Sequence, residues 1–80
     1  RTQLAAAQAQ VHRAQSAVAT AEAGVAQRTA ELQLAEIEFG RVQTLVATAA
    51  RSQAELDQQA AQRDVARAAL LAAEVAVEDA

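Results

Sequence analysis

The sequence contains no cysteine, proline, tryptophan, tyrosine or methionine, and Phe39 is its only aromatic residue. The lack of cysteine excludes a disulfide framework and a thiolate metal site. A compact globule needs bulky side chains to fill its interior, and this short chain is rich in alanine instead. Two helices in close contact need fewer large residues, because alanine lets their backbones approach. With no proline and only two glycines, long stretches are free of helix breakers, so an elongated helical protein is expected.

Charge and hydropathy exclude several other classes. The formal net charge is −3 with only 7 Lys and Arg, whereas binding to nucleic acid needs a basic face. No apolar run approaches the roughly 20 residues that span a bilayer, so this segment is not expected to insert into a membrane. His12 is the single histidine, and no group of ligating residues predicts a metal ion or another cofactor. General acid–base catalysis needs a pocket that excludes water, which two helices cannot enclose, so we expect no enzyme.

Bulky apolar residues recur every seven positions through the first half of the chain. Three positions after each of them, the second position of the heptad seam is mostly alanine. A repeat sustained over six heptads predicts a coiled-coil helix over about 1–47, which would be roughly 70 Å long. The repeating apolar residues are Leu4, Val11, Val18, Val25, Leu32 and Phe39.

The first helix is expected to end at a turn over about 48–51. Ser52 and Glu55 have the spacing of a capping box, in which a serine hydroxyl accepts from the backbone amide of Glu55 while that carboxylate reaches back to the Ser52 amide. A second heptad run follows and predicts a helix over about 52–80. We therefore predict an all-α fold, a long antiparallel two-helix coiled-coil hairpin.

Antiparallel pairing of the two seams predicts the residues of the hairpin core. Several predicted layers set a large residue against a small one, as close packing requires. Gln59, Arg63 and Arg28 fall on seam positions and are expected to turn their polar ends out to water. Leu4 and Val11 have no partner, so the chain, which starts at Arg1 and shows no signal peptide, is interpreted as part of a longer protein. The predicted core residues are Val18, Val25, Leu32, Phe39, Val42, Leu56, Leu70 and Val77.

The outermost heptad positions carry no charge, although they normally face water in a two-helix coil. One interpretation is that alanine is simply abundant and favours helix. The other is that an outer apolar stripe packs against another helix pair, which we favour because bulky residues occur on it. This predicted lateral stripe contains Leu34, Ile37, Val65, Ala68 and Val75.

The residues around the turn carry a family resemblance. Arg41, Leu45 and Ser52 follow an R-x3-L-x6-S spacing, and ELDQ opens the return helix. This spacing resembles the hairpin tip of periplasmic adaptor subunits of bacterial tripartite efflux and secretion pumps, the HlyD-like membrane fusion proteins. The chain departs from many members by having Ala49, Ala50 and Arg51 in place of a glycine and a β-branched residue before the serine.

The resemblance implies a location and a set of partners. Such a hairpin belongs to a protein of the Gram-negative periplasm that is anchored to the inner membrane and carries lipoyl and β-barrel domains, which are absent from these 80 residues. Several hairpins, commonly six, form a funnel that links an inner-membrane transporter to a TolC-type outer-membrane channel. By position, Arg41, Leu45 and Ser52 would dock the channel.

Simpler interpretations of the same residues stay open. Capping alone accounts for Ser52, Leu45 could close the end of the core, and Arg41 could interact with the helix dipole. The chain would then be a purely structural stalk or a dimerisation segment without terminal recognition. A lipid-surface helix is disfavoured, because neither helix sets bulky apolar residues opposite a Lys- or Arg-rich face.

Overall fold

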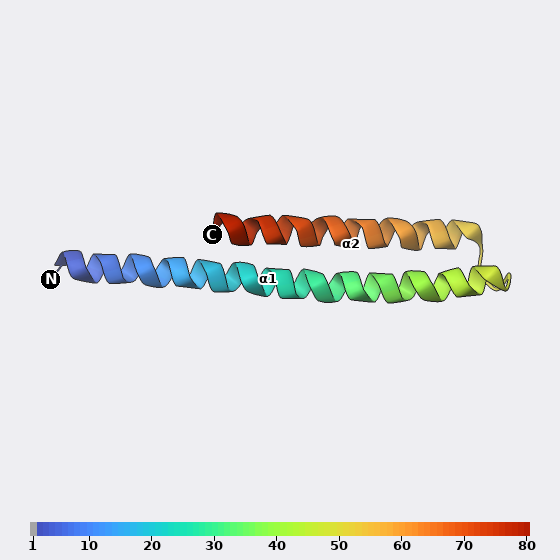
Figure 1. Ribbon diagram of the computed structural model, residues 1–80, viewed down its shortest axis with the longest axis horizontal. Helices are drawn as coiled ribbons and strands as arrows, with labels where there is room; N and C mark the ends of the chain where they lie inside the picture. Colours follow the sequence, from blue (N-terminus) through green and yellow to red (C-terminus); the bar gives the residue numbers. More distant parts are fainter. Residues whose placement is uncertain (1) are drawn as a thin grey trace.

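The computed structural model describes residues 2–80 as two antiparallel helices, α1 (Thr2–Ala47) and α2 (Gln53–Asp79), joined by a short turn. Figure 1 shows them side by side, with the amino-terminal part of α1 extending beyond the end of α2. The molecule measures 72 × 14 × 12 Å, and the part of the chain that is described contains no strand. The predicted all-α hairpin is therefore confirmed.

Helix α1 is continuous over 46 residues despite its two glycines. A side chain at Gly24 or Gly40 would meet nothing within 4 Å, so neither glycine is required for close packing inside the hairpin. Each weakens the helix by about 1 kcal/mol relative to alanine, a cost that the long seam against α2 offsets. Neither helix in residues 2–80 has an apolar stretch long enough to cross a membrane.

In residues 2–80, the seam between the helices is the only core. Val42 is buried, with 4% of its surface exposed, and the other seven predicted core residues are half-buried. This burial is partial because each helix has a neighbour on one side only. Leu4 and Val11 lie where α1 extends past α2, and they are 61% and 56% exposed.

The polar residues at seam positions behave differently from one another. The guanidinium of Arg63 lies 4.4 Å from the centre of the Phe39 ring, and its Nε and Nη2 donate to Asp64 at 3.3 and 3.2 Å. Arg28 is instead turned outward, where it donates to Glu31 at 2.8 Å. The hydrogen bond from Arg28 lowers the pKa of Glu31. Of the two arginines, only Arg63 contributes its side chain to the seam, through a cation–π contact over the ring.

Candidate docking tip and lateral surfaces

The turn at the end of α1 is held by the carbonyl oxygen of Leu45. It accepts from the backbone amides of Ala50 and Arg51 at 2.8 and 3.3 Å and from the hydroxyl of Thr48 at 3.0 Å. The amide of Ala49 donates to the carbonyl of Val46 at 3.0 Å, which together with the Ala50 bond completes a Schellman motif. The tip is thus a defined backbone structure, in which the carbonyls of Leu45 and Val46 accept hydrogen bonds from the turn.

Ala49 has a φ of 61°, the only positive value at a non-glycine among the described residues. This is the left-handed position of the Schellman motif, which glycine usually occupies because a side chain there costs about 1–2 kcal/mol. The departure from glycine noted in the sequence therefore leaves the conformation of the turn intact and adds local strain. Nothing in the residue types around the turn distinguishes Ala49 from Ala47 or Ala50 as the residue that takes this conformation.

The start of α2 is capped by Ser52. Its side-chain oxygen accepts from the amide of Glu55 at 3.2 Å and donates to the Glu55 carboxylate at 3.3 Å. Arg51 also donates to this carboxylate, at 2.7 Å. The hydrogen bond from Arg51 is the main cause that lowers the pKa of Glu55, and the backbone and side chain of Ser52 lower it further. Ser52 thus has a structural role in the hairpin whether or not it also contacts a partner.

Arg41 and Leu45 lie one turn apart on the same face of α1, next to the tip. The Arg41 side chain is 61% exposed and donates to Glu38 at 2.7 Å, back along the helix and away from the terminal carbonyls. Leu45 is half-buried, so part of its surface stays accessible. The fold therefore brings the three predicted tip residues to one end of the rod, with Arg41 and Leu45 accessible beside the cap at Ser52.

The residues of the predicted lateral stripe are all exposed, Leu34 by 61%, Ile37 by 58%, Val65 by 70% and Val75 by 54%. They do not form one stripe, however. Ile37 and Val75 lie opposite the seam on their own helices, so an antiparallel hairpin places them on opposite outer edges, with Ala68 on the edge of Val75. Leu34 and Val65 instead share one flank. The heptad position of a residue shows which face of its own helix it lies on. It does not by itself show which flank or edge of the assembled hairpin the residue occupies.

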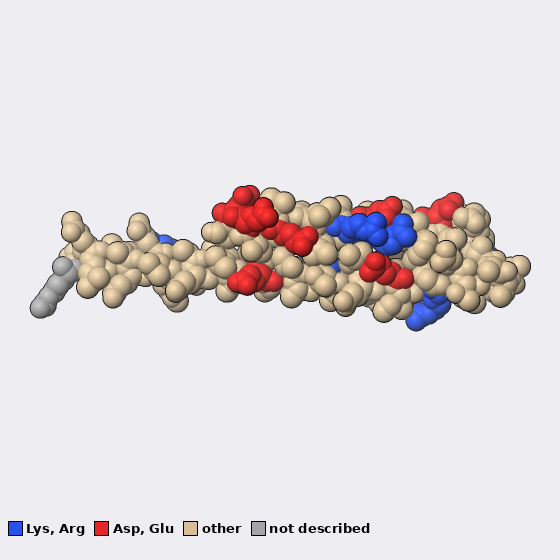
Figure 2. Space-filling view, in the orientation of Figure 1, with Lys and Arg blue, Asp and Glu red and all other residues tan. Residues whose placement is uncertain are grey.

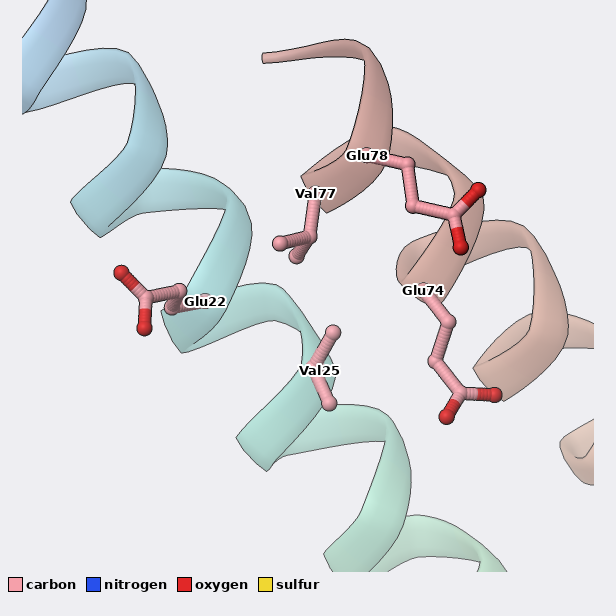
Figure 3. A pocket seen from close by; sticks show the side chains of 5 residues that line it. All are labelled: Glu22, Val25, Glu74, Val77 and Glu78. Atoms are coloured by element: carbon pink, nitrogen blue, oxygen red, sulfur yellow. The ribbon is translucent and has the colours of Figure 1, made fainter.

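Two shallow grooves lie between the helices at nearly the same level. The acidic groove has carboxylates around two valines, as Figure 3 shows, and is lined by Glu22, Val25, Glu74, Val77 and Glu78. The second, named here the Gly24 groove, is lined by Gly24, Gln27, Arg28, Ala69, Ala72 and Ala73. Glu22 and Glu74 lie on one side of the seam residues of their helices and Gly24 and Ala69 on the other, so the two grooves occupy opposite flanks of the hairpin.

The distribution of charge differs along the rod. Figure 2 shows acidic side chains over the carboxyl-terminal part of α2 and the neighbouring part of α1, and few charges where α1 extends alone. No group of three ligating residues in the described range could hold a metal ion. Both grooves lie open on the surface of a two-helix rod.

Comparison with known families gives one match. The family model for the α-helical hairpin domain of RND membrane fusion proteins (RND MFP) matches residues 17–80. Searches among curated proteins and among solved structures give no match. The match includes both helices where they pair and the whole of the turn.

Proposed function

Because the chain belongs to the α-helical hairpin family of RND membrane fusion proteins, we propose that it is the hairpin of a periplasmic adaptor in a tripartite efflux or secretion pump. In this proposal the adaptor is anchored to the inner membrane by further domains. The hairpin links an inner-membrane transporter to a TolC-type outer-membrane channel, and its tip meets the channel. The segment acts by recognition and spacing and carries out no reaction.

The proposal rests above all on the tip. A rod 72 Å long ends in a turn whose backbone is fixed by the Leu45 carbonyl and the Ser52 cap. Fixing the turn before binding lowers the entropy that docking would otherwise cost. Arg41 and Leu45 lie beside this fixed turn. The guanidinium of Arg41 suits carbonyls and carboxylates at the ends of partner helices, and the apolar side chain of Leu45 suits a groove between them.

Arg41 is free to change partners on docking. Its ion pair with Glu38 is exposed, and exposed pairs within a helix are worth only about 0.3–0.5 kcal/mol. A carboxylate or carbonyl of the channel would replace Glu38 in a drier interface, where a hydrogen bond to a charged donor is stronger. The pair with Glu38 therefore costs little free energy to break when Arg41 binds another partner.

Side-by-side packing of hairpins is the second part of the proposal. The exposed apolar residues Leu34 and Val65 lie on one flank and would face a neighbouring hairpin directly. Ile37, Ala68 and Val75 lie on the outer edges and would contact a neighbour only where the bundle curves. The expected number of hairpins in the assembly, six, comes from the resemblance to membrane fusion proteins.

Photo-cross-linking tests the docking directly. A photoreactive residue is placed at position 41, 45 or 13 of the adaptor in cells that contain a TolC-type channel. Arg13 is the matched control, because it lies 28 residues from Arg41 on the same helical face, about 42 Å down α1. Adducts with the channel from positions 41 and 45 alone are the expected result. Absence of adducts from both tip positions would favour a structural stalk.

A further inference from the structure

The turn between the helices contains no residue that prevents a helix. Residues 47–51 are three alanines, a threonine and an arginine, with no glycine or proline among them. Only Ala49 has a positive φ, of 61°. In a continuous helix the amides of Ala49, Ala50 and Arg51 would each donate to the carbonyl four residues earlier, so the hydrogen bonds of the turn would be replaced. The residues of the turn therefore favour a helix that the hairpin does not let them form.

The heptad repeat of the seam also continues through the turn. Val42 is the buried residue of α1 and Leu56 is the first seam residue of α2, and Ala49 lies seven residues from each. A hairpin does not need this continuity, because its turn lets the second helix start at any phase. If residues 48–52 were helical, Ala49 would lie on the same face as the seam residues on either side of it. The residues of this unbroken repeat are Val42, Ala49, Leu56, Arg63, Leu70 and Val77.

Two opened chains would bury the same seam as two hairpins. In an antiparallel pair of continuous helices, α1 of each chain packs on α2 of the other. The guanidinium of Arg63 would then lie over Phe39 of the other copy, as it does over its own Phe39 in the hairpin. Exchange therefore keeps the seam contacts and relieves the left-handed conformation of Ala49. Short connections under strain favour exchange of this kind between identical chains.

We propose that the hairpin exchanges α2 with a second copy of the chain, and that residues 48–52 become helical to give an antiparallel dimer of two continuous helices. This inference does not rest on the proposed function. The Ser52 cap favours the hairpin, and so does the closeness of α2 to α1 within one chain, which acts as an effective concentration on the order of millimolar. The dimer has no turn, so Arg41, Leu45 and Ser52 no longer lie at one end of a rod. Exchange thus removes the candidate docking tip.

The distance between two spin labels on one chain distinguishes the two states. Gln27→Cys/Ala72→Cys gives the cysteine-free chain two exposed label sites, which line the Gly24 groove together in the hairpin. In a continuous helix they are 45 residues and about 68 Å apart. Labelled chain in a large excess of unlabelled chain is heated and cooled at about 1 mM protein, then measured by pulsed electron paramagnetic resonance. A population at the long distance is expected, and the short distance alone would overturn the proposal.

Substitutions in the turn test whether its strain drives the exchange. Ala49→Gly relieves the strain of the hairpin and weakens the continuous helix, so the dimerisation constant should fall by at least about tenfold for each of the two chains. Ser52→Ala removes a cap that only the hairpin uses and should raise the constant by about fivefold for each chain. Ala26→Gly is the control, because Ala26 is exposed and helical in both states. Sedimentation equilibrium measures all three, and equal constants for Ala49→Gly and Ala26→Gly would contradict exchange through the turn. No channel is present, so either result leaves the docking proposal standing.

Discussion

At the scale of single residues, the tip and the seam each depend on one residue in an unusual environment, Ala49 at the turn and Arg63 over the Phe39 ring. Ala49 adopts φ 61° because the Schellman bonds at Val46 and Leu45 require a left-handed residue there. Arg63 remains in the seam because Phe39 offers its ring face, whereas Arg28 turns outward to Glu31. Sequence spacing assigned both arginines to the seam. It could not separate them, since the difference depends on the neighbour across the helix pair.

Replacing Ala49 with glycine is expected to stabilise the hairpin by about 0.5–1 kcal/mol. Glycine removes the steric cost of the left-handed conformation. Part of this stabilisation is lost, because glycine also gives the unfolded chain more conformational entropy. The midpoint of thermal unfolding should rise by about 2–8 °C in circular dichroism. Ala50→Gly serves as the control, because Ala50 does not have a positive φ and the change should lower stability. A lower midpoint for Ala49→Gly would contradict the strain assigned to this residue.

Replacing Arg63 with glutamine is expected to cost about 1 kcal/mol. The change removes the cation–π contact with Phe39 and part of the aliphatic stem that covers the seam. Arg28→Gln is the matched comparison and should cost less, because it removes only an exposed ion pair. Urea unfolding followed by circular dichroism measures both. Equal losses for the two variants would show that the stacking on Phe39 contributes nothing to stability.

At the scale of elements, the heptad repeat and the capping box were the strongest signals. The repeat from Leu4 to Phe39 predicted a helix too long for a globule, and the structure has α1 ending at Ala47. The Ser52–Glu55 spacing predicted the start of the return helix, and α2 begins at Gln53 with Ser52 as its cap. Turn conformation was beyond sequence reasoning, because no glycine marks the left-handed residue.

Acidification is expected to weaken the cap of α2. The pKa of Glu55 is lowered in the folded hairpin, so its ionised form contributes stability that is fully present above the ordinary carboxyl pKa. That contribution is lost as the pH falls through the lowered value, in the range below about pH 4.5. Thermal midpoints between pH 6 and pH 3 should therefore fall less steeply for Glu55→Gln than for the unaltered chain. Identical slopes would show that the contacts with Arg51 and Ser52 do not hold this carboxylate.

At the scale of the whole molecule, the hairpin is a long rod whose end and flanks differ in the side chains that they expose. The tip concentrates the charged and apolar groups suited to docking, and the two flanks differ in charge and shape. The sequence placed Arg41, Leu45 and Ser52 together at the turn and the outer heptad residues in solvent, and their roles in docking and packing stay predictions. It did not predict which residues share a flank, because this depends on how the two helices face each other.

The most direct test of the central claim is co-purification of a TolC-type channel with the proposed adaptor carrying this hairpin. Leu45→Asp and Arg41→Ala are compared with Arg13→Ala, which removes the same charge far from the tip. Circular dichroism of each hairpin establishes that the helices are intact. If the tip docks the channel, the unaltered adaptor and Arg13→Ala retain the channel and both tip variants lose it. Retention of the channel by helical Leu45→Asp and Arg41→Ala variants would contradict docking through the tip.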